Sequence, residues 1–328
     1  MNQLPHKPRR WLLLGLVFAV GSIARASDDE LTLKARHVVQ RKCLINVAVP
    51  IEGTDSIAVG EEDQIRVWSC KDWSAKATLR THTDAVMSLA AASDDLIFSG
   101  GLDGLLVAWN GRAERVVWFH RFAEPIMSIS TDHKGEMIAV ASGTKVYMMK
   151  SGNIVSTITF SDNVTSLVLT ASSKLIVCVP VAVAGKYVKS EIRIIDHPDK
   201  SVDATVLKVD KLLTSLANCE ESASIIIGSR DGYVGAVHVK THEVWALKCH
   251  KDRVNRVSVM SGLPYVLSAS DDKTAAILDM QKRRVIARIS DHKDAVTSAN
   301  YLPKSKEIVS TDVSGEIHVY DFEKALKK

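Results

Sequence analysis

The chain has 328 residues, of which 46% are hydrophobic and 24% charged, as expected of a folded globular protein rather than a disordered or fibrous one. Its net charge of +4 comes entirely from residues 1–26, which contain four basic residues and no acidic one. The rest of the chain has no net charge (38 − 38 = 0) and therefore lacks the excess of basic residues typical of nucleic-acid-binding proteins. The five cysteines are widely spaced and odd in number, so they indicate neither a disulfide framework nor a zinc site.

Residues 1–26 have the order of a targeting leader. A basic segment (MNQLPHKPRR) precedes an apolar run (WLLLGLVFAVG), and Ala24 and Ala26 have the spacing of a signal-peptidase site. The apolar run is shorter than the ~20 residues that span a bilayer, so no stable membrane span is expected. A mitochondrial presequence also fits. Three locations stay open: the cytoplasm or nucleus, which the unpaired cysteines favour slightly, the secretory pathway, and the mitochondrion.

Residues 27–328 carry an internal repeat. The segments RTHTDAVMSL (80–89), KCHKDRVNRV (248–257) and SDHKDAVTSA (290–299) resemble one another. Their histidines are 42 residues apart (292 − 250) and 168 residues apart (250 − 82), which is four times 42. Spacing in multiples of one period indicates a repeat architecture.

Seven apolar runs follow the same period, and six of them follow a turn-like cluster. Each unit reads as four short strands, because its apolar residues alternate and β-branched residues are frequent. In the second copy these strands are VMSLAAA, LIFSG, LLVAWN and ERVVWFH. No helix is expected after residue 27. The seven runs are IRVWS (65–69), LLVAWN (105–110), KVYMMK (145–150), IRIID (192–196), YVGAVH (233–238), TAAILD (274–279) and IHVYD (317–321).

Four-stranded units at this period are typical of a β-propeller, and over residues 31–322 the repeat resembles that of WD40-repeat proteins. The family's GH dipeptide corresponds to His37, His82, His250 and His292, and its WD dipeptide to WS, WN, ID, LD and YD. The resemblance implies an all-β fold: a single seven-bladed β-propeller of four-stranded blades, closed by an N-terminal strand. Residues 31–35 (LTLKA) align with ATLRT (77–81), so we expect them to complete the last blade.

The second copy keeps the whole structural motif. The resemblance implies that His82, Ser99, Asp103 and Trp109 form a hydrogen-bonded chain, because a buried imidazole and indole each need a partner. The first three also have the residue types of a catalytic triad, but the repeat explains them better. The stretch SGGLDG (99–104) lacks the spacing, the lysine and the following helix of a phosphate-binding loop. No enzyme activity, cofactor or metal is expected.

The first copy is assigned His37, Asp63 and Trp68, without a serine. The fourth copy has a longer insertion, VAVAGKYVKS (181–190), which should project from the top face of the propeller as a hairpin. Solvated loops are the simplest interpretation of the polar residues on that face. The residues with which we expect it to contact partners are Arg80, Arg121, Lys186, Tyr187, Lys251, Arg253 and Lys293.

The function expected from the resemblance is that of a non-catalytic scaffold or adaptor: a monomeric propeller within a complex that presents its loops to partner proteins. One alternative is a propeller that binds a small ligand or an enzyme substrate in its central channel. Another is an RNA- or ribosome-associated assembly factor, which the neutral body of the chain disfavours. Direct nucleic-acid binding is not expected.

Overall fold

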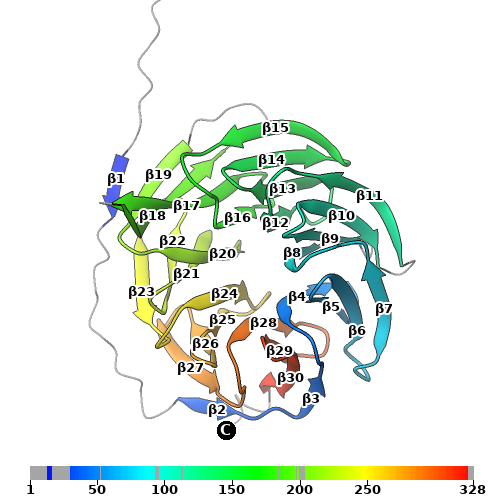
Figure 1. Cartoon of the computed structure of the whole chain (residues 1–328). Helices are drawn as coiled ribbons and strands as arrows, with labels where there is room; N and C mark the ends of the chain where they lie inside the picture. The colour runs from blue at the N-terminus through cyan, green and yellow to red at the C-terminus, as the bar shows by residue number, and fades with distance from the viewer. Residues whose placement is uncertain are drawn as a thin grey trace, which may run out of the picture.

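Seven β-sheets, each with four antiparallel strands, stand around a central axis in the computed structural model, like the blades of a propeller (Figure 1). The structure describes residues 13–16, 30–51, 53–92, 96–111, 114–183, 185–196, 198 and 204–323. The expected all-β, seven-bladed propeller of four-stranded blades is therefore confirmed. In the described residues no helix is long and apolar enough to cross a membrane.

Each blade runs outward from the axis, and in the first six blades the four strands of the repeat follow one another in the chain. The first three blades consist of β4 (Ile45–Ile51), β5 (Ser56–Glu61), β6 (Gln64–Ser69) and β7 (Ala75–Arg80); β8 (Val86–Ala91), β9 (Leu96–Gly101), β10 (Leu105–Asn110) and β11 (Arg115–Arg121); and β12 (Ile126–Thr131), β13 (Met137–Ser142), β14 (Lys145–Lys150) and β15 (Asn153–Thr159).

The other four blades continue around the ring. The fourth and fifth contain β16 (Ser166–Leu169), β17 (Leu175–Val183), β18 (Lys186–Ile195) and β19 (Ala204–Val209), then β20 (Leu213–Cys219), β21 (Ser224–Ser229), β22 (Tyr233–His238) and β23 (Val244–Lys248). The sixth and seventh contain β24 (Val254–Val259), β25 (Tyr265–Ser270), β26 (Ala275–Asp279) and β27 (Arg284–Ile289), then β28 (Val296–Leu302), β29 (Glu307–Asp312), β30 (Glu316–Asp321) and β3 (His37–Gln40).

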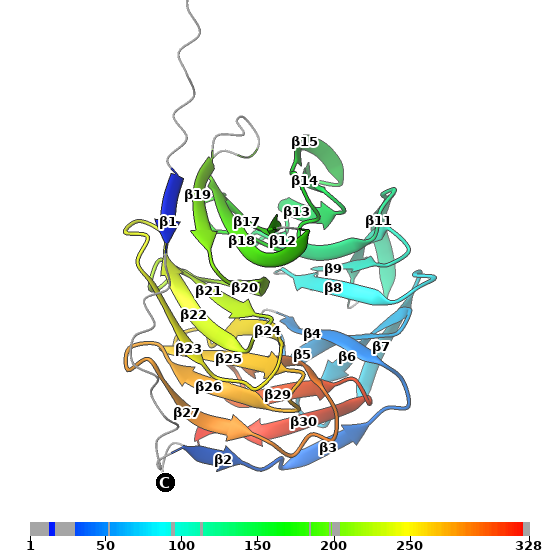
Figure 2. The same ribbon diagram turned by 60° about the vertical axis from the view of Figure 1, so that its left-hand side comes forward.

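An N-terminal strand closes the ring, as expected, but it is not residues 31–35. The fourth strand of the last blade is β3, which pairs antiparallel with β30 through His37 opposite Val319. The segment expected in that place contains β2 (Leu31–Leu33), which runs parallel to β27 and adds a fifth strand to the sixth blade. Figure 2 shows β2 beside β27 and β3 beside β30.

The physical reason for this correction lies in what the strand β2 buries. Leu33 is buried in the apolar cluster that contains Ala287 and Ile289 of β27. The Ala35 amide donates to Asp291 (3.0 Å), and Glu30 pairs with the Arg288 guanidinium (2.6 Å). These contacts hold the segment on the sixth blade. The similarity of residues 31–35 to outer strands therefore correctly predicted an outer strand, but this strand belongs to the sixth blade and not to the seventh.

The apolar core lies between neighbouring blades. In the second blade Gly100 allows close approach of the third blade, because a Cβ there would lie 2.4 Å from Ile126 Cγ2 and 2.8 Å from Ile129 Cδ1. The turn of SGGLDG also needs glycine: Gly104 has φ +70°, and a Cβ would lie 2.5 Å from the Phe122 carbonyl oxygen. SGGLDG is thus the tight connection between β9 and β10.

Serines of the inner strands join one blade to the next around the axis. In five cases the serine hydroxyl accepts a backbone N–H from the inner strand of the following blade; in two others it donates to a backbone carbonyl there. The first group is Ser88 with Ile129, Ser128 with Leu167, Ser130 with Leu169, Ser166 with Leu216 and Ser215 with Val257; the second is Ser258 with Ala299 and Ser298 with Ala48.

The fourth blade departs from the others on two sides. Its β17–β18 hairpin pairs as far as Val183 opposite Lys186 and so extends beyond the shorter hairpins, as the insertion predicts. On its outer edge β1 (Leu13–Leu16) lies parallel to β19, with Leu13 opposite Val206. Apart from β1, the expected leader lies outside the described residues, so its role stays a prediction.

Candidate protein-interaction face and central channel

The second blade contains one continuous chain of hydrogen bonds between its top loops and its third strand. Trp109 Nε1 donates to Ser99 Oγ (2.8 Å), which also bonds His82 Nε2 (2.7 Å). His82 Nδ1 lies 3.2 Å from both carboxylate oxygens of Asp103. Asp103 in turn accepts the backbone N–H groups of Thr83 (2.9 Å) and Leu105 (3.0 Å). The chain ties the loop before β8 to the β9–β10 turn.

Burial and hydrogen bonding set the protonation of this chain. Burial lowers the pKa of His82, although Asp103 opposes the shift. Burial alone would raise the pKa of Asp103, but the two backbone N–H groups and His82 together lower it. A neutral His82 donates from Nδ1 to Asp103 and accepts the Ser99 proton at Nε2. Every proton in the chain then has an acceptor.

The same geometry explains why the triad-like residues serve structure. Ser99 is 0% exposed, and its oxygen already accepts the Trp109 N–H while its proton is directed to His82. A serine nucleophile needs access to a substrate and a nearby oxyanion site. Ser99 is closed to solvent, and its hydroxyl is already engaged by Trp109 and His82, so it cannot reach a substrate.

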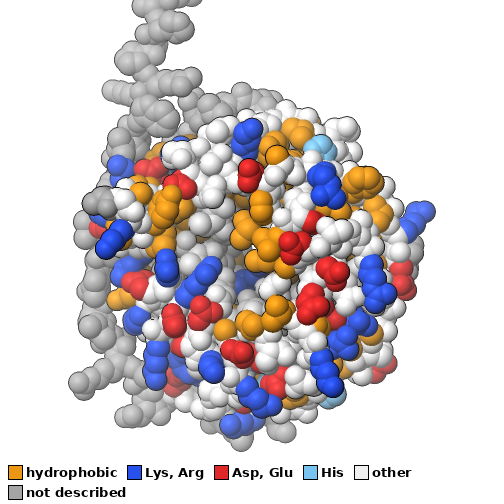
Figure 3. Space-filling view, viewed as in Figure 1, with side chains coloured by type: hydrophobic (Ala, Val, Ile, Leu, Met, Phe, Trp, Pro, Cys, Tyr) orange, Lys and Arg blue, Asp and Glu red, His pale blue; other side chains and the backbone are white. Residues whose placement is uncertain are grey.

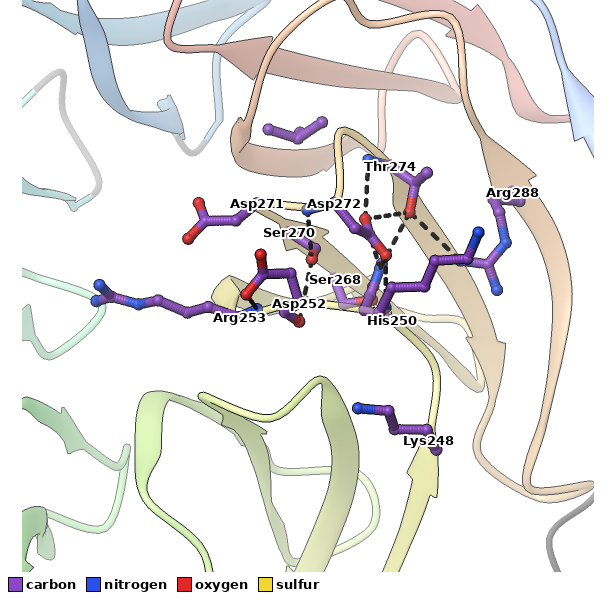
Figure 4. A network of polar contacts seen from close by, with 12 residues as sticks. Lys248, His250, Asp252, Arg253, Ser268, Ser270, Asp271, Asp272, Thr274 and Arg288 are labelled. Carbon is purple, nitrogen blue, oxygen red and sulfur yellow. Dashed lines mark hydrogen bonds and ion pairs between the residues drawn. The ribbon is translucent and has the colours of Figure 1, made fainter. Parts of the chain in front are cut away.

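The sixth blade repeats the chain without the indole. His250 Nε2 bonds Ser268 Oγ (2.8 Å), and its Nδ1 lies 3.1 Å from Asp272 Oδ2 (Figure 4). Thr274 adds a bond to the same nitrogen (3.0 Å). Leu278 occupies the position of the tryptophan, so the Ser268 hydroxyl bonds the imidazole and no indole. Burial lowers the pKa of His250 as it does that of His82.

The seventh blade contains a third version that the sequence analysis missed. His292 bonds Ser310 (2.6 Å) and Asp312 (2.8 Å). Asp312 follows Ser310 by two residues, whereas Asp103 of the second blade follows Ser99 by four. The motif of the seventh blade therefore does not appear at the expected spacing. The ring of His318 stacks on His292 with centroids 4.0 Å apart.

This blade also holds the group of possible metal ligands found in the described residues: His292, Asp312, Glu316 and His318. The imidazole nitrogens are already engaged, since His318 bonds Glu316 (2.9 Å) and Tyr320 (3.1 Å). The two rings lie 25° from parallel, so their lone pairs do not converge on one point. The cluster is accounted for as a hydrogen-bond network.

In the first blade the assignment of His37 is wrong. His37 begins β3 and is exposed, whereas the residue four positions before the inner strand, as His82 stands before β8, is Arg41. Arg41 (3.3 Å) and Arg66 (3.0 Å) both pair with the buried carboxylate of Glu61. Val59 replaces the serine, and Trp68 Nε1 has no hydrogen-bond partner among the described residues. An arginine–glutamate cluster therefore replaces the histidine chain.

The predicted contact residues are all exposed, and the order of the strands puts them on one face of the ring. This top face consists of the connections between blades and the hairpins between the second and third strands. Arg80 and Arg121 end outer strands, Lys251, Arg253 and Lys293 lie in connections between blades, and Lys186 and Tyr187 lie at the tip of the β17–β18 hairpin. Lys186 with Tyr187 and Lys251 with Arg253 are near neighbours in the chain; the others are spread around the ring.

Several of these side chains are held by the propeller itself. Arg121 donates to the Asp103 carbonyl (2.9 Å), Lys293 to Glu316 (2.7 Å) and Tyr187 to Asp162 (2.6 Å). In the described part of the chain, the side chains of Lys186, Lys251 and Arg253 have no hydrogen bond or ion pair.

The centre of the ring is hollow. A cavity of about 530 Å³ is lined mostly by the inner strands, with serine, threonine and asparagine residues beside a similar number of apolar residues. Its charged residues are Arg253, Arg256 and Asp271. Figure 3 shows the hollow with a blue side chain in its depth. Sequence reasoning missed Arg256, although an arginine within the strand VNRVSV was a signal.

Comparison with known proteins agrees with this architecture. The family model "WD domain, G-beta repeat" matches residues 73–110 and 241–279, each of which covers an outer strand and the three inner strands of the next blade. These segments contain His82 and His250, respectively.

Two curated relatives match parts of the chain. It is 32% identical to a p21-activated protein kinase-interacting protein 1-like of Danio rerio over 130 residues, which are 38% of this chain and 35% of that protein. It is 28% identical to the DNA damage-binding protein 2 of Bos taurus over 104 residues, which are 30% of this chain and 24% of that protein. The match spans well under half of either relative. Together with the seven four-stranded blades, these findings show that the chain contains WD40 repeats and is similar to WD40-repeat β-propeller proteins.

Proposed function

We propose that the protein is a non-catalytic interaction scaffold that presents the loops of its top face to one or more partner proteins. WD40 propellers are typically scaffolds or adaptors. The observation that carries the proposal is the set of exposed side chains that the ring places on this face, six of them basic and one aromatic. Rigid blades hold the loops in place before a partner arrives, which lowers the ordering cost of binding.

The charge on this face favours an acidic segment of the partner. Lys186, Lys251 and Arg253 have no internal partner among the described residues, so they contact an acidic surface without breaking a bond of the propeller. Complementary charge of this kind steers the encounter and fixes its orientation.

The names of the two relatives support binding over catalysis. One names an interaction with a protein kinase and the other names binding to DNA damage. For this chain we favour a protein partner, since residues 27–328 have no net charge and a nucleic-acid backbone attracts a basic surface.

The test compares two charge-reversed variants in affinity purification followed by mass spectrometry. The first carries Lys251→Glu, Arg253→Glu and Lys293→Glu on the top face. The matched control carries Lys282→Glu, Arg283→Glu and Arg284→Glu in the β26–β27 turn on the opposite face. We expect the first variant to lose partners that the wild type and the control retain, with all three proteins melting as folded domains. Equal recovery by both variants would eliminate the proposal.

A further inference from the structure

Arg256 is a positive charge inside the ring without a counter-charge. It lies on β24 and lines the central cavity, and its side chain has no hydrogen bond or ion pair with any described residue. The other partly buried arginines of the described chain each pair with a carboxylate: Arg41 and Arg66 with Glu61, Arg193 with Glu191, and Arg288 with Glu30. Arg256 is therefore the exception to a consistent pattern.

Such a group is costly to keep. A guanidinium removed from bulk water loses hydration that an ion pair normally restores. Burial lowers the pKa of Arg256 to about 10, with no neighbouring carboxylate to oppose the shift. The side chain still carries its proton at neutral pH, so the cavity holds a permanent positive charge.

The rest of the cavity is suited to an anion. Its acidic residue, Asp271, accepts a hydrogen bond from Asn255 Nδ2 (2.6 Å), and Arg253 adds a second unpaired guanidinium at the top-face mouth. Figure 4 shows Arg253 extending away from the His250 network. Two positive charges thus stand against one carboxylate.

Hydroxyl groups add neutral donors to the same space. Ser128, Ser166 and Ser215 line the cavity, and each of their oxygens accepts a backbone N–H from the next blade. A hydroxyl that accepts one N–H still has its own proton to donate. The cavity, about 530 Å³, has the size of a small-molecule site.

We propose that the central channel binds a small oxyanion of the phosphate or carboxylate class, with the fork of the Arg256 guanidinium as its main partner. Planar guanidinium groups match both anions through two parallel N–H bonds. Arg253 attracts the anion at the mouth, and the serine hydroxyls complete its hydrogen bonds. The site shares Arg253 with the top face, but its main residue, Arg256, is not among the predicted partner contacts.

The test is isothermal titration of the full chain at low salt with four probes: inorganic phosphate, pyrophosphate, succinate and citrate. The expected result is saturable binding of at least one probe, weakened tenfold or more in Arg256→Met. Arg256→Lys should recover part of the affinity, because lysine keeps the charge and loses the fork. The matched control, Arg284→Met, removes an exposed arginine from the outer strand β27 and should bind as the wild type does.

The outcomes separate the two sources of oxyanion. Binding of the two phosphates alone assigns a phosphate ligand, and binding of succinate or citrate alone assigns a carboxylate ligand. No saturable binding by the wild type, or equal affinity in Arg256→Met, overturns the inference. Loss of partner recovery with intact anion binding would instead concern only the top face, so the two proposals fail separately.

Discussion

Ser99 is the central residue of the hydrogen-bond chain in the second blade, so Ser99→Ala tests whether that chain stabilises the fold. The hydroxyl serves two buried groups, Trp109 Nε1 at 2.8 Å and His82 Nε2 at 2.7 Å, and is itself 0% exposed. Its removal leaves both without a partner and without water. Since an orphaned buried polar group costs about 1–3 kcal/mol, the loss of both partners should lower the free energy of unfolding by roughly 2–6 kcal/mol.

The sixth blade supplies an internal comparison. Ser268 is equally buried but serves only His250 Nε2 (2.8 Å), because Leu278 stands in place of the tryptophan. Ser268→Ala should therefore cost about 1–3 kcal/mol, less than Ser99→Ala. The exposed Ser305→Ala controls for the substitution itself. Urea denaturation followed by tryptophan fluorescence and circular dichroism measures all three. A loss in Ser99→Ala no greater than in Ser268→Ala would refute the reasoning.

Three further predictions concern pH, ring closure and the channel. Burial lowers the pKa of His82, so the contribution of the neutral imidazole to the free energy of unfolding is present above pH 6.5 and is lost as pH falls below it. The stability advantage of the wild type over His82→Gln should therefore shrink from pH 7.5 to pH 5. A constant difference would contradict this. Deletion of residues 1–36 removes β1 and β2 and should leave a cooperative but weaker fold. Deletion of residues 1–40 also removes β3 and should abolish cooperative melting; equal behaviour of the two variants would show that β3 does not close the ring. Arg256→Met removes an unpaired charge and should raise the denaturation midpoint, while a lower midpoint would point to an unseen partner.

The blades were predictable because the same pattern of residues recurs several times along the chain at one period. His82, His250 and His292 stand at multiples of 42 residues, and the strand runs follow the same spacing. Where one copy has diverged, the pattern is misleading. Arg41 replaced the histidine of the first blade, and the nearby His37 took its place in the assignment, which shifted the expected closing strand from residues 37–40 to residues 31–35.

The channel was not predictable for a different reason. Which residues of the inner strands face the axis depends on how seven blades close, and no single repeat contains that information. The absence of a carboxylate beside Arg256 is likewise a property of the whole ring, since its neighbours come from blades far apart in the chain. A sequence pattern shows that the arginine interrupts an apolar strand. Only the closed ring shows that it lacks a partner.

The central claim, that partners dock on the top face, is tested most directly by lysine cross-linking of the purified complex with mass-spectrometric mapping. The exposed lysines Lys186, Lys251 and Lys293 report on that face, and Lys282 reports on the opposite one. We predict that cross-links to the partner concentrate on the first three. Cross-links confined to Lys282 would contradict the account.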